Sequence, residues 1–129
     1  MEKMIVSPTS PYTHDQLMRD IHALCAAYPG LVSSEEAGYS VEGRALPLIR
    51  LGTGPAALLC CGAHHAREYI TSAYLMYMVN TYARAAVANR RLGGFDIAKL
   101  LRDCSLFVMP MVNPDGVALA QGGPRAVQH

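Results

Sequence analysis

The chain has 129 residues, of which 51% are hydrophobic and 16% are charged, and its net charge is +1. This length suits one domain with a modest core, and the balanced charge, with no basic run longer than Arg90-Arg91, excludes the nucleic-acid binders. The charged fraction lies well below the roughly 25% of an average soluble domain, which indicates apolar surface that other protein would cover.

The first predicted element is a helix that begins after Thr13. Thr13 and Gln16 have the spacing of a capping box, in which each side chain satisfies a free N–H of the first turn. Pro29-Gly30 ends the helix. Apolar residues recur between these signals at helical spacing and form one stripe: Leu17, Ile21, Leu24, Cys25 and Tyr28.

Four strand-like runs are predicted, two of them beside a turn signal. Residues 32–39 and 45–51 flank a glycine-containing segment, Glu42-Gly43-Arg44, which favours a hairpin. Residues 56–63 (AALLCCGA) show no polar alternation, which predicts a strand buried on both faces. Residues 104–112 (CSLFVMPMV) have the same character and predict a second buried strand.

A long helix over residues 68–88 is apolar nearly all round, so we expect neighbours on more than one side of it. Its tyrosines, Tyr74 and Tyr77, are predicted to be core residues and not substrate contacts. Gly93-Gly94 separates it from a short helix over residues 96–102 with Asp96 as its N-cap. The tail, residues 121–129, lacks periodicity and is expected to be loose. This order predicts an α/β fold with a partial mixed β-sheet flanked by helices, in one domain over 1–129.

The four cysteines (Cys25, Cys60, Cys61 and Cys104) lack the C-x-x-C spacing of a zinc or redox site. We expect them to be buried, reduced thiols that act as small hydrophobic residues.

Polar clusters follow the two apolar strands. The first strand leads into His64-His65-Ala66-Arg67-Glu68, and the second leads into Asn113-Pro114-Asp115-Gly116. Ligands of open α/β sheets bind beyond the carboxyl ends of the strands. The residue types of the second cluster favour a turn in any protein, so we interpret Asp115 and Gly116 as shaping a loop beside the site.

His65 and Glu68 lie three residues apart, where one turn of helix would bring an imidazole nitrogen and a carboxylate to a common point. Both groups are zinc ligands, and a catalytic zinc takes three protein ligands plus a water. His64 lacks this spacing, so the metal is assigned to His65. Arg67 is always protonated and cannot bind a metal, but it could polarise a substrate carbonyl.

The segment His65-Ala66-Arg67-Glu68-Tyr69-Ile70 resembles the metal-binding signature of the zinc carboxypeptidase family, of the carboxypeptidase A type, and Asn113-Pro114-Asp115-Gly116 resembles its next landmark. The resemblance covers about residues 5–120. It implies the N-terminal half of a zinc-carboxypeptidase-like α/β/α domain with Zn²⁺ as cofactor. It also implies that His65 and Glu68 are the first two zinc ligands and that Arg67 is the carbonyl-polarising arginine.

In that family the third zinc ligand and the general-base glutamate lie further along the chain, and no residue of this sequence matches them. We therefore expect residues 1–129 to be a truncated peptidase domain that is inactive alone, because the water on a weakly held zinc would have no proton acceptor. An unpaired sheet edge beside apolar helix faces also predicts self-association.

The expected substrate is a peptide, and the γ-D-glutamyl–diamino acid peptidase branch makes a cell-wall peptide one possibility. Two alternatives stay open: an amidohydrolase of the aspartoacylase or desuccinylase type, and a non-catalytic interaction module. Residues 1–10 lack the apolar core of a signal peptide, and the longest charge-free helical stretch, residues 69–83, is too short for a bilayer. We expect no membrane partner and a cytoplasmic location for the chain as given, although a longer parent could be secreted.

Overall fold

The computed structural model describes residues 3–8 and 11–128. Its elements, in chain order, are α1 (His14–Ala27), β1 (Val32–Tyr39), β2 (Ala45–Gly52), β3 (Ala56–Cys61), α2 (Ile70–Val87), β4 (Arg91–Leu92), β5 (Phe95–Asp96), α3 (Ile97–Asp103), β6 (Cys104–Met109), α4 (Pro114–Gly122) and a 3-10 turn (Pro124–Ala126).

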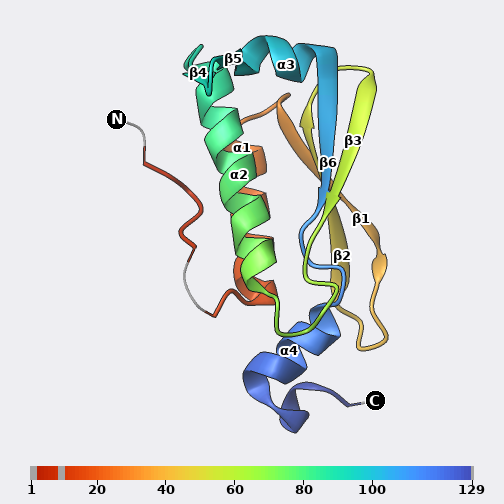
Figure 1. Cartoon of the computed structure of the whole chain (residues 1–129). Coiled ribbons are helices and arrows are strands. Elements are labelled where there is room, and N and C mark those ends of the chain that lie inside the picture. Colours follow the sequence, from red (N-terminus) through yellow and green to blue (C-terminus); the bar gives the residue numbers. More distant parts are fainter. Residues whose placement is uncertain (1–2, 9–10, 129) are drawn as a thin grey trace.

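The main sheet has four strands in the order β1-β2-β6-β3. β1 and β2 form the predicted antiparallel hairpin, β2 is antiparallel to β6, and β6 is parallel to β3. Helices α1 and α2 lie side by side on one face of this sheet, α3 lies at one end of it and α4 at the other (Figure 1). The predicted fold class, α/β with a mixed sheet flanked by helices, is therefore confirmed.

The core lies between the sheet and the two long helices. Alternate residues of β2 and β6 point to the helical side and are buried, and they pack in one cluster with the apolar stripes of α1 and α2. Burial of one such side chain stabilises the fold by about 1.5–3 kcal/mol. The residues of this cluster with almost no exposed surface include Leu17, Leu24, Ile49, Leu51, Met76, Val79 and Val108.

Helix α1 begins where predicted, but with one half of the predicted capping box, because the Gln16 side chain bonds Asp20 and Arg19. The Thr13 side chain accepts a hydrogen bond from the Gln16 N–H at 3.1 Å, which satisfies one of the free donors of the first turn. The segment before the helix is also fixed, because Tyr12 donates to the buried Asp20 carboxylate at 2.6 Å. Burial, and after it this contact with Asp20, raises the pKa of Tyr12 far above its usual range.

Strand β3 is not buried on both faces as its composition predicted. It is the edge of the sheet, and Leu58 and Leu59 keep 58% and 59% of their surface exposed. Among the described residues it pairs with β6 alone, so its outer edge has no strand partner there. The prediction was wrong because an uninterrupted apolar run indicates that a strand avoids water, not which neighbour shields it.

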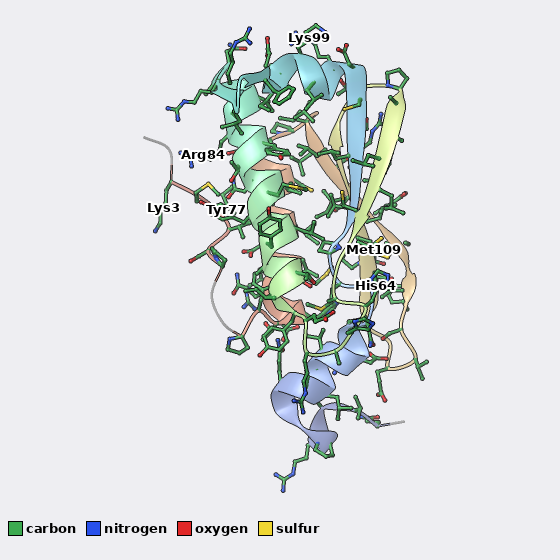
Figure 2. The ribbon with its side chains drawn as sticks, viewed as in Figure 1. Lys3, His64, Tyr77, Arg84, Lys99 and Met109 are labelled. Carbon is green, nitrogen blue, oxygen red and sulfur yellow. The ribbon has the colours of Figure 1, made fainter. Side chains whose placement is uncertain are left out.

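The expectation for the tyrosines of α2 was also wrong. Tyr74 and Tyr77 are 70% and 43% exposed, and Ile70 on the same stripe is 65% exposed. This stripe faces away from the sheet, and Tyr77 projects outward from the middle of the helix (Figure 2). The opposite side of α2 carries the buried residues, so one stripe of a nearly all-apolar helix stays exposed in the part of the chain that the structure describes.

Two further expectations differ from the structure. All four cysteines are free, but none is buried: Cys61 is exposed, and Cys25, Cys60 and Cys104 are partly exposed. The tail contacts the domain, because Arg44 donates to the Ala126 carbonyl and the Gln128 N–H donates to Glu42. His129 lies outside the described residues. Within residues 3–8 and 11–128, no helix combines the length and hydropathy that crossing a bilayer requires.

Candidate metal site

The two predicted polar clusters meet at one end of the sheet. Because β3 and β6 are parallel neighbours, their carboxyl ends lie together, and the loop before α2 and the start of α4 follow from them (Figure 1). His64 lies at this end of the molecule (Figure 2). The backbone joins the two connections directly, since the Asn113 N–H donates to the Ala63 carbonyl at 3.0 Å.

His65 and Glu68 are brought together. The His65 Nδ1 lies 2.8 Å from Glu68 Oε2, and the two side chains are 81% and 59% exposed. The geometry that joins them is a tight turn and not the first turn of the long helix, because the Glu68 N–H donates to the His65 carbonyl while α2 begins at Ile70. A carboxylate only accepts hydrogen bonds, so Nδ1 carries the proton in this contact.

These two groups fit a zinc ion in part. A zinc ion held by both groups would replace the proton that His65 Nδ1 and Glu68 Oε2 now share. Within residues 3–8 and 11–128, however, no cluster of three or more His, Cys, Asp or Glu side chains could hold a metal ion. The described residues therefore bring together two groups of the types that bind zinc, one fewer than the three protein ligands of a catalytic zinc.

Arg67 is exposed and makes no hydrogen bond or ion pair within the part of the chain that the structure describes. A guanidinium beside the pair of His65 and Glu68, with its donors free, can bind the oxygen of an incoming carbonyl or carboxylate. The His64 side chain is exposed as well, and only its backbone carbonyl is engaged, by the Asn113 side chain.

Asn113-Pro114-Asp115-Gly116 does not form a free-standing turn. It begins helix α4: Asn113 is the N-cap and accepts from the Gly116 N–H at 3.0 Å, and Pro114 occupies the first helical position, where its missing N–H costs nothing. The residue types that favour a turn are also those that favour the first positions of a helix, and here they begin a helix.

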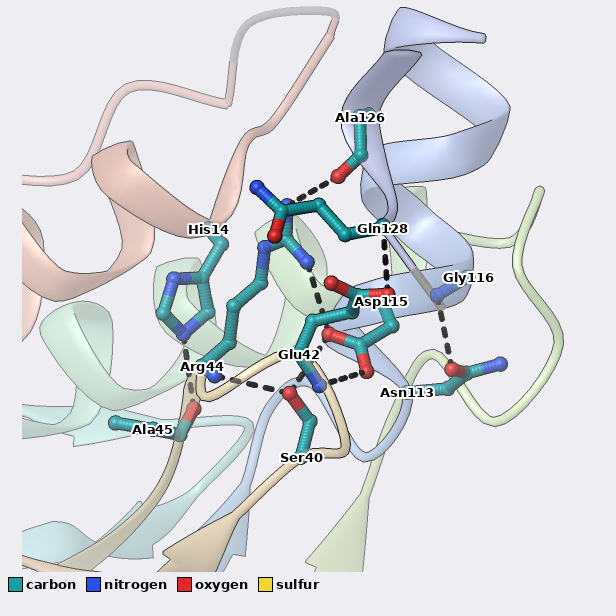
Figure 3. Close-up of polar contacts among 10 residues, drawn as sticks. All are labelled: His14, Ser40, Glu42, Arg44, Ala45, Asn113, Asp115, Gly116, Ala126 and Gln128. Atoms are coloured by element: carbon teal, nitrogen blue, oxygen red, sulfur yellow. Dashed lines mark hydrogen bonds and ion pairs between the residues drawn. The ribbon is translucent and has the colours of Figure 1, made fainter. Parts of the chain in front are cut away.

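Asp115 fastens this helix start to the β1–β2 hairpin (Figure 3). Its carboxylate accepts hydrogen bonds from the Ser40 hydroxyl at 2.7 Å, the Glu42 N–H at 3.1 Å and the Arg44 guanidinium at 2.9 Å. Partial burial raises the pKa of Asp115, but the bonds from Ser40, Glu42 and Arg44 outweigh burial and hold the pKa below its ordinary value of 3.8. The interpretation of Asp115 as a loop-shaping residue agrees with these contacts.

Replacement of Asp115 by asparagine is expected to lower the free energy of unfolding at pH 7 by about 2 kcal/mol, because Arg44 loses its charged partner. The folded-state pKa of Asp115 is depressed, so its stabilisation is complete above pH 3.8 and disappears as the pH falls through the lower folded value. The difference between wild type and Asp115→Asn in urea unfolding should therefore shrink below pH 3.8. Asp103→Asn, which breaks an exposed pair with Lys99, should change stability little; equal effects of the two variants would contradict the prediction.

The sequence reasoning overlooked Thr71, whose hydroxyl contacts the loop that carries His65 and Glu68. The available signal was a hydroxyl residue in the first turn of a largely apolar helix, and Ser72 beside it gives the same signal. Its partner Ala63 lies eight residues earlier, so no local pattern could reveal the contact.

The sequence matches the family model of zinc carboxypeptidases over residues 17–128. It is similar to the gamma-D-glutamyl-L-diamino acid endopeptidase 1 of Lysinibacillus sphaericus, with 34% identity over 122 residues that cover 95% of this chain and 31% of that protein. It is also 34% identical to carboxypeptidase B of Astacus astacus, over 85% of this chain and 35% of that protein. The chain thus spans about a third of the length of these relatives.

Solved structures show the same fold. Bovine thrombin-activatable fibrinolysis inhibitor, in complex with tick carboxypeptidase inhibitor, aligns with a TM-score of 0.74 at 22% identity, over 91% of this chain and 38% of that chain. A metallo-carboxypeptidase from Burkholderia cenocepacia aligns with a TM-score of 0.68 at 24% identity, over 85% of this chain and 29% of that chain.

Proposed function

Because the chain belongs to the zinc carboxypeptidase family, we propose that it supplies part of a zinc-peptidase active site, with His65 and Glu68 as two zinc ligands and Arg67 as the group that binds the substrate carbonyl. The observation that carries this proposal is the 2.8 Å contact between His65 Nδ1 and Glu68 Oε2 at the joint carboxyl end of β3 and β6. A zinc titration tests the ligands, and hydrolysis of peptides tests Arg67.

Each residue has a distinct task. His65 must release its Nδ1 proton to bind a metal, and Glu68 offers a carboxylate beside it. Bound zinc supplies Lewis-acid chemistry for the hydrolysis of a peptide bond. Arg67 would donate hydrogen bonds to the oxygen of the scissile carbonyl, where negative charge develops as the carbonyl is attacked. Its free guanidinium supports this role, because no carboxylate among the described residues neutralises it.

We propose that this chain by itself does not hydrolyse peptides. The described residues hold no third ligand beside His65 and Glu68, so zinc would be held weakly. Zinc-dependent hydrolysis by the wild-type chain that disappears in His65→Ala would contradict inactivity and, at the same time, support the assignment of His65.

The proposed substrate class is peptides. The 34% identity to an endopeptidase named for γ-D-glutamyl-diamino acid bonds supports a cell-wall peptide, while the equal identity to carboxypeptidase B supports peptides more generally. The family match over residues 17–128 favours a peptidase over an amidohydrolase of the aspartoacylase type. A non-catalytic module is disfavoured because His65, Arg67 and Glu68 are all present at the expected end of the sheet.

We also propose that the chain self-associates through β3. This strand is an unprotected edge with exposed leucines, and such edges pair with other chains. Leu59→Lys places a charge on the exposed edge and should shift the chain from dimers or larger species toward monomers in sedimentation at micromolar concentration. Val41→Lys, at an exposed residue in the loop after β1, serves as the control. A wild-type chain that is already monomeric at this concentration would contradict the proposal.

A further inference from the structure

The loop that carries His65 and Glu68 begins with a conformation that alanine rarely adopts. Ala63 has φ +53°, in the left-handed region, and is 2% exposed. A non-glycine residue is strained in that region, and it persists there only where its surroundings hold it. The contacts of Ala63 therefore show what shapes this loop.

Thr71 makes the first of these contacts. Its hydroxyl oxygen accepts a hydrogen bond from the Ala63 N–H at 2.8 Å and donates one to the Glu68 carbonyl at 2.7 Å. One hydroxyl therefore ties the residue that starts the loop to the residue that supplies the carboxylate. An apolar side chain of the same shape would remove both of these hydrogen bonds, and only the backbone N–H of Thr71, at 3.0 Å, would still donate to the Glu68 carbonyl.

Asn113 holds the other side of the same loop. Its backbone N–H donates to the Ala63 carbonyl at 3.0 Å, and its side-chain Nδ2 donates to the His64 carbonyl at 3.2 Å. The Asn113 side chain is itself oriented by the Gly116 N–H, which donates to Oδ1. The backbone before His65 is thus anchored to the start of α4, and the backbone around Glu68 is anchored to the start of α2.

A bond from a threonine hydroxyl to the carbonyl three residues earlier is a common local feature of helix starts and by itself indicates nothing about a site. The bond from the Ala63 N–H is different. It spans eight residues, and it stabilises a main-chain conformation that alanine does not favour. The geometry therefore assigns Thr71 to the loop and not only to its own helix.

We propose that Thr71 is a positioning residue, whose hydroxyl sets the distance between His65 and Glu68 by clamping the backbone at both ends of their loop. It touches neither of these side chains. The proposal rests on the proposed function, since zinc binding is the role that this spacing would serve. Both side chains are largely exposed, so the backbone that carries them has more influence on their positions here than in a buried site.

The test compares three variants of this chain. Thr71→Val keeps the side-chain shape and removes the hydroxyl, while Thr71→Ser keeps the hydroxyl. Thr81→Val removes a buried hydroxyl from the same helix that has no hydrogen-bond partner among the described residues. The measurements are the zinc dissociation constant, hydrogen exchange of the Ala63 amide in metal-free protein, and the ¹⁵N shifts of the His65 ring, which report whether Nδ1 carries the proton.

Thr71→Val is expected to raise the zinc dissociation constant about 10- to 100-fold, the effect of losing a group that orients a ligand. The same variant should speed exchange of the Ala63 amide at least tenfold and should reduce the share of the His65 ring with its proton on Nδ1. Thr71→Ser and Thr81→Val should behave like wild type in all three measurements.

Unchanged Ala63 exchange and unchanged His65 shifts in Thr71→Val would overturn the proposal, and so would equal losses in Thr71→Val and Thr81→Val. The two metal-free measurements also separate this proposal from the proposed function. A wild type that binds no zinc would refute the zinc assignment, while the Ala63 and His65 measurements would still decide whether Thr71 positions the loop.

Discussion

Replacement of His65 by alanine is expected to raise the zinc dissociation constant of the metal-stripped chain by at least about 100-fold. Among residues 3–8 and 11–128, His65 and Glu68 are the only proposed ligands, and no third group stands ready to compensate for a lost imidazole. What remains is one exposed carboxylate, which binds zinc no better than other surface carboxylates. Calorimetric titration of wild type and variant measures the difference.

His64→Ala is the matched control for this experiment. It removes the neighbouring imidazole, which is equally accessible but lies outside the contact with Glu68. We expect its zinc affinity to stay within about threefold of wild type. A larger loss in His64→Ala than in His65→Ala would move the metal assignment to His64. Tight wild-type binding that vanishes in His65→Ala would indicate that a group from a second chain completes the site.

Replacement of Arg67 by alanine is expected to lower kcat by about 10²–10³ in a context that completes the site, which is the effect of removing one donor to a developing oxyanion. A suitable context is a graft in which this chain replaces its matching segment in the Lysinibacillus sphaericus endopeptidase, to which it is 34% identical. Zinc content should not change, because a guanidinium is not a metal ligand. Hydrolysis of a γ-D-glutamyl-diamino acid peptide and metal analysis measure the two effects separately.

Arg90→Ala in the same graft is the control for charge. Arg90 is exposed just beyond the far end of α2, so its removal changes the net charge equally without touching the site. It should leave kcat nearly unchanged. If Arg67→Ala retained wild-type kcat, or lost its zinc together with its activity, the role proposed for Arg67 would be wrong.

Features that depend on neighbouring residues could be predicted from the sequence. The cap at Thr13, the hairpin over β1 and β2 and the N-cap at Asp96 all follow from hydrogen bonds between residues a few positions apart, and all are present. The spacing of His65 and Glu68 belongs to the same class. The two side chains meet as this spacing predicted, although the local structure is a turn and not a helix. Both geometries place residues three apart on the same side.

Features that depend on distant residues could be decided only by the tertiary structure. An apolar sequence indicates a preference for burial, but the exposure of β3 and of Tyr74 depends on which elements pack beside them. The bond from Asn113 to His64 joins residues 49 positions apart, and it exists because β3 and β6 are parallel neighbours. The amino-acid sequence alone thus determined most of the elements, although not helix α4, and the contact between His65 and Glu68. Long-range packing decided which elements are covered and what holds the loop that carries His65 and Glu68. Burial and the hydrogen bonds to this loop depend on residues that are close in space but distant in the sequence.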